Sequence, residues 1–300
     1  MTRHLHTCML CEAVCGLEVE LDGTRVASVR GDPDDPFSRG HICPKAAAIV
    51  DVQDDPDRIR EPQRKDGTRV SWEVALDEVG ARLAGIQREH GRSAVGVYLG
   101  NPSVHSYSAL LATPLFNRAL GTRSRFSATS VDQLPHMLAA LKIFGHQLLM
   151  PVPDVDRTSF FLMLGANPLA SNGSLMTAGG IGRRLNELKA RGGKLVVVDP
   201  RRTETAAIAD QFVQIRPGTD ALFLLALLQV VFEEKRDRVP ANADGLAELR
   251  AAAARFPPER VAARTGIAAA TIRELARAFA GAPSAEIGRA SCRERVCVPV

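Results

Sequence analysis

The sequence lacks an apolar run long enough to cross a membrane. A spanning helix needs about 18–20 apolar residues, and the longest run, residues 221–232, is shorter and is interrupted by Gln229. No basic, hydrophobic or twin-arginine leader precedes the first cysteine. The formal net charge of +4 is small for 300 residues and does not favour nucleic acid as a partner. We therefore expect a cytoplasmic protein with no membrane span and no bound nucleic acid.

Cysteine is sparse, but four of the six cysteines gather near the N-terminus. The pattern is C-x2-C-x3-C followed by a distant fourth: Cys8, Cys11, Cys15 and Cys43. Clustered cysteines in a reducing compartment favour a metal over disulfides. Zinc sites usually combine two short C-x2–4-C pairs, and only the first pair has that form here. Three thiolates from one loop and one from another suit a cubane, so the pattern favours a [4Fe-4S] cluster over zinc.

The periodicity predicts an α/β fold. Apolar and polar residues alternate on both sides of Asp22 and Gly23, which predicts a β-hairpin between the third and fourth cysteines. From about residue 71 onward, short apolar strands alternate with helices, as in a parallel sheet covered on both faces. We expect a small β-rich N-terminal module that holds the metal, followed by doubly wound parallel α/β domains. The last residues fit no element.

Polar loops follow three of the predicted strands. They span residues 165–174, 199–203 and 215–220, and open α/β sheets bind ligands at the carboxyl ends of their strands. A carboxylate there can accept hydrogen bonds from a guanine edge or a ribose, and arginines can hold a pyrophosphate. The same residues are also typical of helix N-caps and turns. No GxGxxG motif indicates an ordinary NAD site, but three such loops in succession predict a dinucleotide-like ligand.

With these motifs assembled, the chain resembles the N-terminal part of the molybdopterin oxidoreductase family. That family includes formate dehydrogenases and nitrate reductases that use bis-molybdopterin guanine dinucleotide. The resemblance extends from Cys8 to about Ala280. It rests on the cysteine pattern with Cys43, Pro44 and Lys45, and on ordered loops at residues 165–168, 197–205 and 216–220. It implies that the four cysteines ligate a [4Fe-4S] cluster and that a bound pterin carries molybdenum or tungsten.

The resemblance also assigns roles to other residues. Lys45 would lie between the cluster and the pterin as a hydrogen-bonding bridge in electron transfer; the alternative is a solvated lysine at a helix start. The guanine dinucleotide would be held by residues of the loops at the strand ends, which are Asn101, Gly165, Asn167, Pro168, Ser171, Asn172, Asp199, Arg201, Thr203, Gly218 and Asp220.

The protein ligand to the metal departs from the nearest relatives. Formate dehydrogenases supply a cysteine or selenocysteine after the strand that corresponds to Phe126, and this loop contains neither. With Pro135 as the anchor, Asp132 takes the place of the ligand, and Ser130 is the second candidate. The alternative is that Asp132 caps the helix that starts near Pro135. Gln133 replaces the histidine that follows the ligand in formate dehydrogenases, which disfavours formate as the substrate.

Four segments are predicted. Residues 1–57 form the [4Fe-4S] domain, residues 58–127 the first part of an α/β domain, and residues 128–284 a Rossmann-like domain that binds the guanine dinucleotide. Residues 285–300 are expected to be a tail foreign to the native protein, with Cys292 and Cys297 incidental. Because the family's C-terminal barrel is missing, we expect a fragment that is inactive alone.

The resemblance implies an oxidoreductase that passes electrons between a small-molecule substrate and the cluster, and then to an external electron acceptor or donor protein. The alternative is a non-catalytic iron–sulfur subunit related to the large iron–sulfur subunit of NADH dehydrogenase. Those subunits carry further cysteine clusters upstream, and this chain begins seven residues before Cys8. A third hypothesis is a zinc-binding interaction module, which would be colourless, whereas a thiolate-held cubane is brown.

Overall fold

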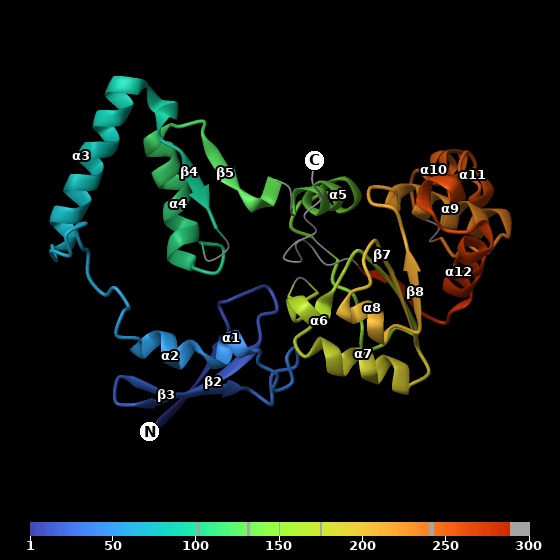
Figure 1. Cartoon of the computed structure of the whole chain (residues 1–300), viewed down its shortest axis with the longest axis horizontal. Helices are drawn as coiled ribbons and strands as arrows, with labels where there is room; N and C mark the ends of the chain where they lie inside the picture. Colours follow the sequence, from blue (N-terminus) through green and yellow to red (C-terminus); the bar gives the residue numbers. More distant parts are fainter. Residues whose placement is uncertain (101–102, 131–132, 150, 175, 240–242, 289–300) are drawn as a thin grey trace. The chain divides into compact units, whose positions relative to one another are not determined.

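The computed structural model describes the chain except for residues 101–102, 131–132, 150, 175, 240–242 and 289–300. Its contacts divide the chain into two compact units, Met1–Met150 and Pro151–Val300 (Figure 1). The first unit contains the cysteine module and a small parallel sheet. The second contains a four-stranded parallel sheet. The finer domain boundaries drawn from the sequence stay predictions.

The N-terminal module is a three-stranded antiparallel sheet. Its strands are, in spatial order, β1 (Thr2–Thr7), β2 (Gly16–Asp22) and β3 (Arg25–Gly31). The predicted hairpin is confirmed, because β2 and β3 pair around a turn in which Gly23 has a φ of 61°. The sequence did not predict β1, whose six residues are all exposed and lack apolar alternation. The helices α1 (Pro44–Ala47) and α2 (Ile49–Asp54) follow.

The two faces of this sheet differ in chemistry. On one face, Leu17, Val19 and Val29 pack into the hydrophobic cluster that contains the cysteines. On the other face, the side chain of Glu18 is buried between the guanidinium groups of Arg3 and Arg30. This alternation follows from the twofold repeat of a strand, and it directs the apolar side toward the cysteines.

The rest of the first unit alternates helices and strands. Its helices are α3 (Trp72–His90), α4 (Tyr107–Leu120) and α5 (Leu134–Phe144), with short 3-10 turns η1 (Arg92–Ala94) and η3 (Ala128–Ser130). The strands β4 (Val97–Leu99) and β5 (Arg125–Ser127) pair in parallel. Ser71 caps α3 by accepting a hydrogen bond from the backbone N–H of Val74 at 3.3 Å. Gly121 ends α4 with a φ of 60°.

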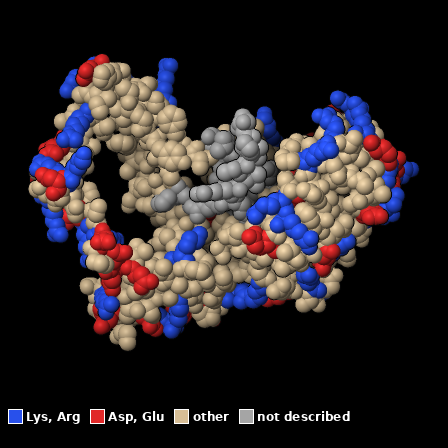
Figure 2. Space-filling model, in the orientation of Figure 1, with Lys and Arg blue, Asp and Glu red and all other residues tan. Residues whose placement is uncertain are grey.

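This part of the first unit buries little apolar surface. Among its described residues, only Val95, Leu120 and Ala140 are buried apolar side chains. Helix α3 has no buried residue, and Leu76 is 65% exposed; on α4, Leu111 is 75% exposed. The surface over α4 in Figure 2 is largely uncharged. The helices therefore expose the apolar stripes that normally pack against a core.

The second unit is built on a parallel sheet. Its strands are, in spatial order, β8 (Gln211–Gln214), β7 (Lys194–Asp199), β6 (Phe160–Leu164) and β9 (Ala285–Gly288). All three pairings are parallel. Every residue of β6 is buried, as expected for a continuous apolar strand that is covered on both faces.

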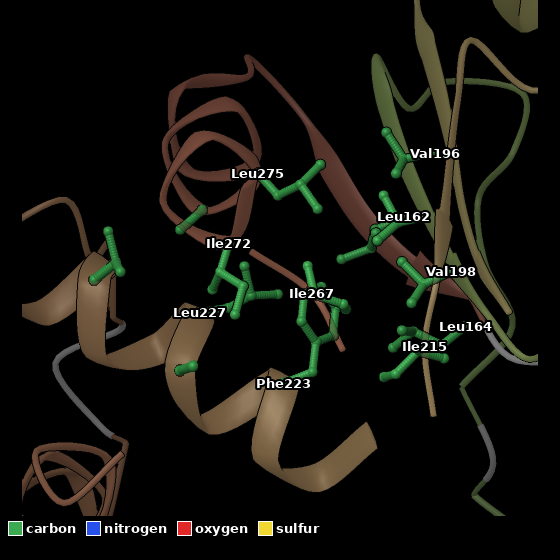
Figure 3. Close-up of a cluster of buried hydrophobic side chains, with 14 of the residues drawn as sticks. Leu162, Leu164, Val196, Val198, Ile215, Phe223, Leu227, Ile267, Ile272 and Leu275 are labelled. Carbon is green, nitrogen blue, oxygen red and sulfur yellow. The ribbon is translucent and has the colours of Figure 1, made fainter. Parts of the chain in front are cut away.

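Helices cover both faces of this sheet. One core joins alternate residues of β6 and β7 to α9 (Asp220–Glu233), α11 (Pro258–Thr265) and α12 (Ala269–Gly281). Figure 3 shows strand side chains such as Leu162 and Val196 on one side of this core, and Phe223 and Ile272 from the helices on the other. The other core joins the remaining strand residues to α7 (Ile181–Ala190) and α8 (Glu204–Ile208). The predicted doubly wound α/β fold is confirmed in this unit.

The remaining helices are α6 (Pro168–Ser171) and α10 (Leu246–Ala253). None of the described helices combines the length and the apolar character that a membrane crossing demands. The expectation that the last residues fit no element is wrong for residues 285–288. They form β9, because Ala285 pairs with Phe160 at the open edge of β6, a long-range contact that local periodicity does not reveal. Cys292 and Cys297 lie outside the described residues.

Candidate metal and cofactor sites

The first three cysteines lie on the loop of a β-hairpin. Strands β1 and β2 pair up to Thr7 and Gly16, and the loop between them is closed by a hydrogen bond from the backbone N–H of Cys8 to the carbonyl of Cys15, at 2.8 Å. Val14 takes a φ of 46° in this loop. The hairpin therefore holds three thiols on one short turn, which is the arrangement predicted from the cysteine spacing.

The fourth cysteine is brought back by a clamp at the end of β3. A Cβ atom on Gly31 would lie 2.1 Å from the carbonyl oxygen of Gly40, so only glycine permits this backbone approach. The hydroxyl of Ser38 accepts a hydrogen bond from the N–H of Gly16 at 3.1 Å and donates one to Asp35 at 2.6 Å. These contacts fasten the segment before Cys43 to the residue after the third cysteine.

The four thiols influence one another. None of the four is in a disulfide, and Cys8, Cys11 and Cys15 are buried, at 6–8% exposure. Burial, followed by the proximity of the other three thiols, raises the pKa of Cys15 to about 11. Burial also raises the pKa of Cys8. Bare thiolates are therefore disfavoured in this pocket, and a cationic metal centre would stabilise them.

Lys45 lies beside this group. It is the second residue of α1 and is exposed, and its ammonium group lowers the pKa of Cys8. Glu12, on the cysteine loop, places its Oε1 3.9 Å from His105 Nε2. The sequence did not single out either partner of this contact.

The donor set fits a thiolate-held centre. Among the described residues, no three His, Cys, Asp or Glu side chains converge as the ligands of a single metal ion do. The four cysteines supply thiols from two segments of chain, three from one loop and one from another. The same division in the sequence pattern favoured a cubane cluster over zinc.

In the second unit, the predicted loops lie together at the carboxyl ends of the parallel strands β6, β7 and β8. The chain runs outward from β6 to β7 and β8 and then returns to β9 on the other side of β6. The order of the strands therefore reverses at β6, and such a switch point is where open α/β sheets bind ligands. The loop that follows β6 carries five predicted residues, namely Gly165, Asn167, Pro168, Ser171 and Asn172.

This loop has unused capacity for a ligand. The hydroxyl oxygen of Ser171 is buried and has no hydrogen-bond partner in the structure. Gly165 takes a φ of 54°, and apart from its two chain neighbours nothing lies within 4 Å of the position that its Cβ would occupy. Asn172 ends α6 in the left-handed conformation, with a φ of 57°. A buried hydroxyl without a partner and open space at Gly165, both in this loop, fit a polar ligand.

A buried carboxylate stands at the end of the next strand. Asp199 is 4% exposed, and its Oδ1 accepts a hydrogen bond from the N–H of Arg201 at 2.7 Å. Burial raises the pKa of Asp199, Arg201 opposes this effect, and the nearby Asp220 adds to it. Thr203 and Thr219, not the two aspartates, occupy the N-cap positions of α8 and α9. Gly218 has a φ of 74° and open space at its Cβ position.

Three predicted residues are not placed. Asn101 and Asp132 lie outside the described residues, and the structure describes the backbone of Ser130 in η3 but not its side chain. The assignment of Asp132 or Ser130 as the metal ligand and that of Asn101 as a cofactor-binding residue therefore stay predictions.

The chain matches two families of known proteins. Residues 1–55 match the molybdopterin oxidoreductase Fe4S4 domain, and residues 58–241 match the molybdopterin oxidoreductase family. The chain belongs to the molybdopterin oxidoreductase family. All four clustered cysteines fall within the Fe4S4 match, and the three loops of the second unit fall within the other. The two matches confirm the predicted cofactors, which are a [4Fe-4S] cluster for the first domain and molybdopterin for the second.

Individual known proteins match along most of the chain. A nitrate reductase of Symbiobacterium thermophilum is 30% identical and covers 90% of it. The molybdopterin-containing subunit of a thiosulfate reductase from Salmonella typhimurium is 28% identical and covers 91%. Among solved structures, acetylene hydratase from Pelobacter acetylenicus is 25% identical over 95% of the chain, with a TM-score of 0.72. The chain spans only 37%, 36% and 40% of these three proteins.

Proposed function

We propose that this chain is the cluster-binding and nucleotide-binding part of a molybdenum or tungsten bis-pterin oxidoreductase. The observation that carries the proposal is the gathering of four unpaired thiols, three of them buried, in a domain that matches the Fe4S4 family. The whole enzyme would pass electrons between a small-molecule substrate and the cluster, and onward to an external redox protein.

The residues of the chain have distinct parts in this proposal. Cys8, Cys11, Cys15 and Cys43 would hold a cluster, which supplies one-electron transfer when bound. Lys45 would place a positive charge beside that cluster and offer hydrogen bonds toward the pterin.

In the second unit, Asp199 would accept hydrogen bonds from a guanine edge or a ribose. The exposed guanidinium of Arg201 would face a phosphate. Asp132 stays the proposed protein ligand to the metal, with Ser130 as the second candidate. We also propose a cytoplasmic location, which suits four thiols kept free of disulfides.

The test is the composition of the full-length protein purified without oxygen. We expect about four iron atoms per chain, together with molybdenum or tungsten and guanine nucleotide released by acid. Iron without pterin or a group-6 metal would reject the enzyme and favour the non-catalytic electron-transfer subunit. A colourless protein with zinc would reject both.

A matched pair of variants tests the ligand set. Cys43→Ser should abolish the brown colour and most of the bound iron, because a cubane that loses one thiolate is destabilised. Cys297→Ser, made like Cys43→Ser in the 300-residue chain, removes a cysteine outside the proposed set and should keep both the colour and the iron. Equal iron in the two variants would contradict the ligand assignment.

A further inference from the structure

Asn167 is held in an unusual way for its position. It precedes α6, where an asparagine ordinarily accepts a hydrogen bond from its own helix, but its side chain makes no such bond. It crosses instead to the first two residues of α8, the helix that follows β7. Its Oδ1 accepts hydrogen bonds from Thr205 N at 3.2 Å and from Thr205 Oγ1 at 2.8 Å, and its Nδ2 donates to Glu204 Oε2 at 2.7 Å.

These bonds use most of the hydrogen-bonding groups of the Asn167 amide. An amide oxygen has two lone pairs, and Thr205 occupies both. The orientation of the amide is fixed, because a backbone N–H can only donate. Asn167 is 3% exposed and Thr205 is fully buried. The hydroxyl of Thr205 also accepts a hydrogen bond from Leu169 N at 3.3 Å, which closes a cross-link between the two loops.

The cross-link joins the two segments that carry Ser171 and Asp199, the residues with unused hydrogen-bonding positions. Figure 1 shows α6 beside α8, and the Asn167–Thr205 bonds lie between them. Beyond Asn167, the loop continues to Ser171, whose buried hydroxyl has no partner. Ahead of α8 stands Asp199, of which Oδ1 is occupied by the N–H of Arg201. The described structure gives the other oxygen of Asp199 no hydrogen bond.

We propose that Asn167 is a positioning residue for the guanine nucleotide and not one of its ligands. Through Thr205 it ties the loop after β6 to the start of α8, and so to the loop that joins β7 to this helix. The two loops, which carry Ser171 and Asp199, are then already held at the spacing that one nucleotide needs, and preorganisation of this kind improves affinity. This inference rests on the proposed function, because it requires that the strand ends bind a guanine nucleotide.

The experiment is a double-mutant cycle on the full-length protein prepared free of its pterin cofactor, with GDP as the probe and calorimetry as the readout. Asn167→Ala and Thr205→Val should each weaken GDP binding about tenfold, as expected for one buried hydrogen-bond link. The double variant should also be weakened only about tenfold, because both changes remove the same link. Thr205→Ser keeps the hydroxyl and should restore binding to within about twofold of the unaltered protein.

A matched control separates positioning from general stability. Thr158 is a buried threonine at the opposite end of β6, where its Oγ1 donates to the carbonyl of Phe160 at 3.1 Å. Thr158→Val should lower the melting temperature as Thr205→Val does but leave GDP binding unchanged. If Thr158→Val weakens GDP binding as much as Thr205→Val does, the loss of binding follows from lower stability alone, and the inference is overturned.

Two results would contradict the proposal directly. If Asn167→Ala weakens GDP binding far more than Thr205→Val, and the two losses multiply in the double variant, Asn167 contacts the nucleotide itself. If Thr205→Val leaves GDP affinity unaltered, the cross-link has no positioning role. This second result stands even if Asn167→Ala fails to fold. An unaltered protein that binds no GDP would instead reject the proposed nucleotide site, and with it the inference built on that site.

Discussion

Asp35 fastens the segment before Cys43 to the residue after Cys15. Burial alone raises the pKa of Asp35, but hydrogen bonds from Ser38, Gly16 and Phe37 outweigh burial and lower that pKa below its usual value. The ionised carboxylate is therefore the form that stabilises the clamp. Because the pKa is lower in the folded state, the contribution is present above the unfolded value and is lost as pH falls through the folded one.

We expect Asp35→Asn to lower the free energy of unfolding of the module by about 1–2 kcal/mol at pH 7, because it leaves buried donors without a charged acceptor. The difference from the unaltered protein should shrink below about pH 3.9, where the unfolded carboxyl becomes protonated. Urea unfolding followed by circular dichroism at several pH values measures both effects. Asp34→Asn changes the exposed neighbour and should have little effect; an equal loss would exclude the clamp as the cause.

Lys45 should set the redox behaviour of a bound cluster. Its ammonium group acts on Cys8, and a positive charge favours the reduced, more negative state. We expect Lys45→Gln to lower the reduction potential by about 40 mV, which corresponds to about 1 kcal/mol in a one-electron couple. A redox titration followed by electron paramagnetic resonance measures the shift. Lys65→Gln removes an exposed lysine from the turn between Gln63 and Arg69, and a similar shift there would remove the special role of Lys45.

Single residues were predictable where their chemistry is encoded by spacing. The spacing of the cysteines indicated a cluster, and the structure places three of them on one hairpin loop. The partners of Asn167 were not predictable, because Thr205 lies 38 residues away in the sequence. Its contact depends on which strands become neighbours in the sheet.

At the level of elements, glycine decides how the turn that carries Cys43 can pack. We expect Gly31→Ala to destabilise the module by about 1–3 kcal/mol, the usual cost of overpacking, because its Cβ would meet the carbonyl of Gly40 at 2.1 Å. Bound iron should fall as well. Gly80→Ala is the matched change in an open position of α3, and there it should stabilise by about 0.5–1 kcal/mol. Thermal unfolding and iron content distinguish the two, and a neutral Gly31→Ala would contradict the close approach.

Elements with strong local signals were predicted closely. The hairpin around Asp22 and Gly23 was predicted from alternating apolar residues, and β2 and β3 pair there in the structure. Two strands were missed for different reasons. Strand β1 has an exposed, polar sequence, and β9 becomes a strand only because the edge of β6 is open to it. Edge pairing is a property of the assembled sheet, so no local pattern records it.

Across the whole molecule, burial is uneven between the two units. Leu185 on α7 is fully buried in a core of the second unit, whereas Leu111 on α4 is 75% exposed. We expect Leu185→Ala to cost about 2–5 kcal/mol of stability and Leu111→Ala to change it by less than about 0.5 kcal/mol. Differential scanning calorimetry of the two variants measures the contrast. A large loss from Leu111→Ala would show that this side chain is covered in the protein in solution.

The pairing of β9 with β6 has a consequence for how the polypeptide is made. Phe160 and its partner Ala285 are 125 residues apart in the sequence, and at ordinary rates a ribosome needs about 6–25 s to synthesise that length. Throughout that interval β6, an inner strand of the finished sheet, is an unprotected edge. Strand edges of this kind recruit other chains. The nascent second unit is therefore most exposed to misassembly after β7 and β8 have formed and before residues 285–288 leave the ribosome.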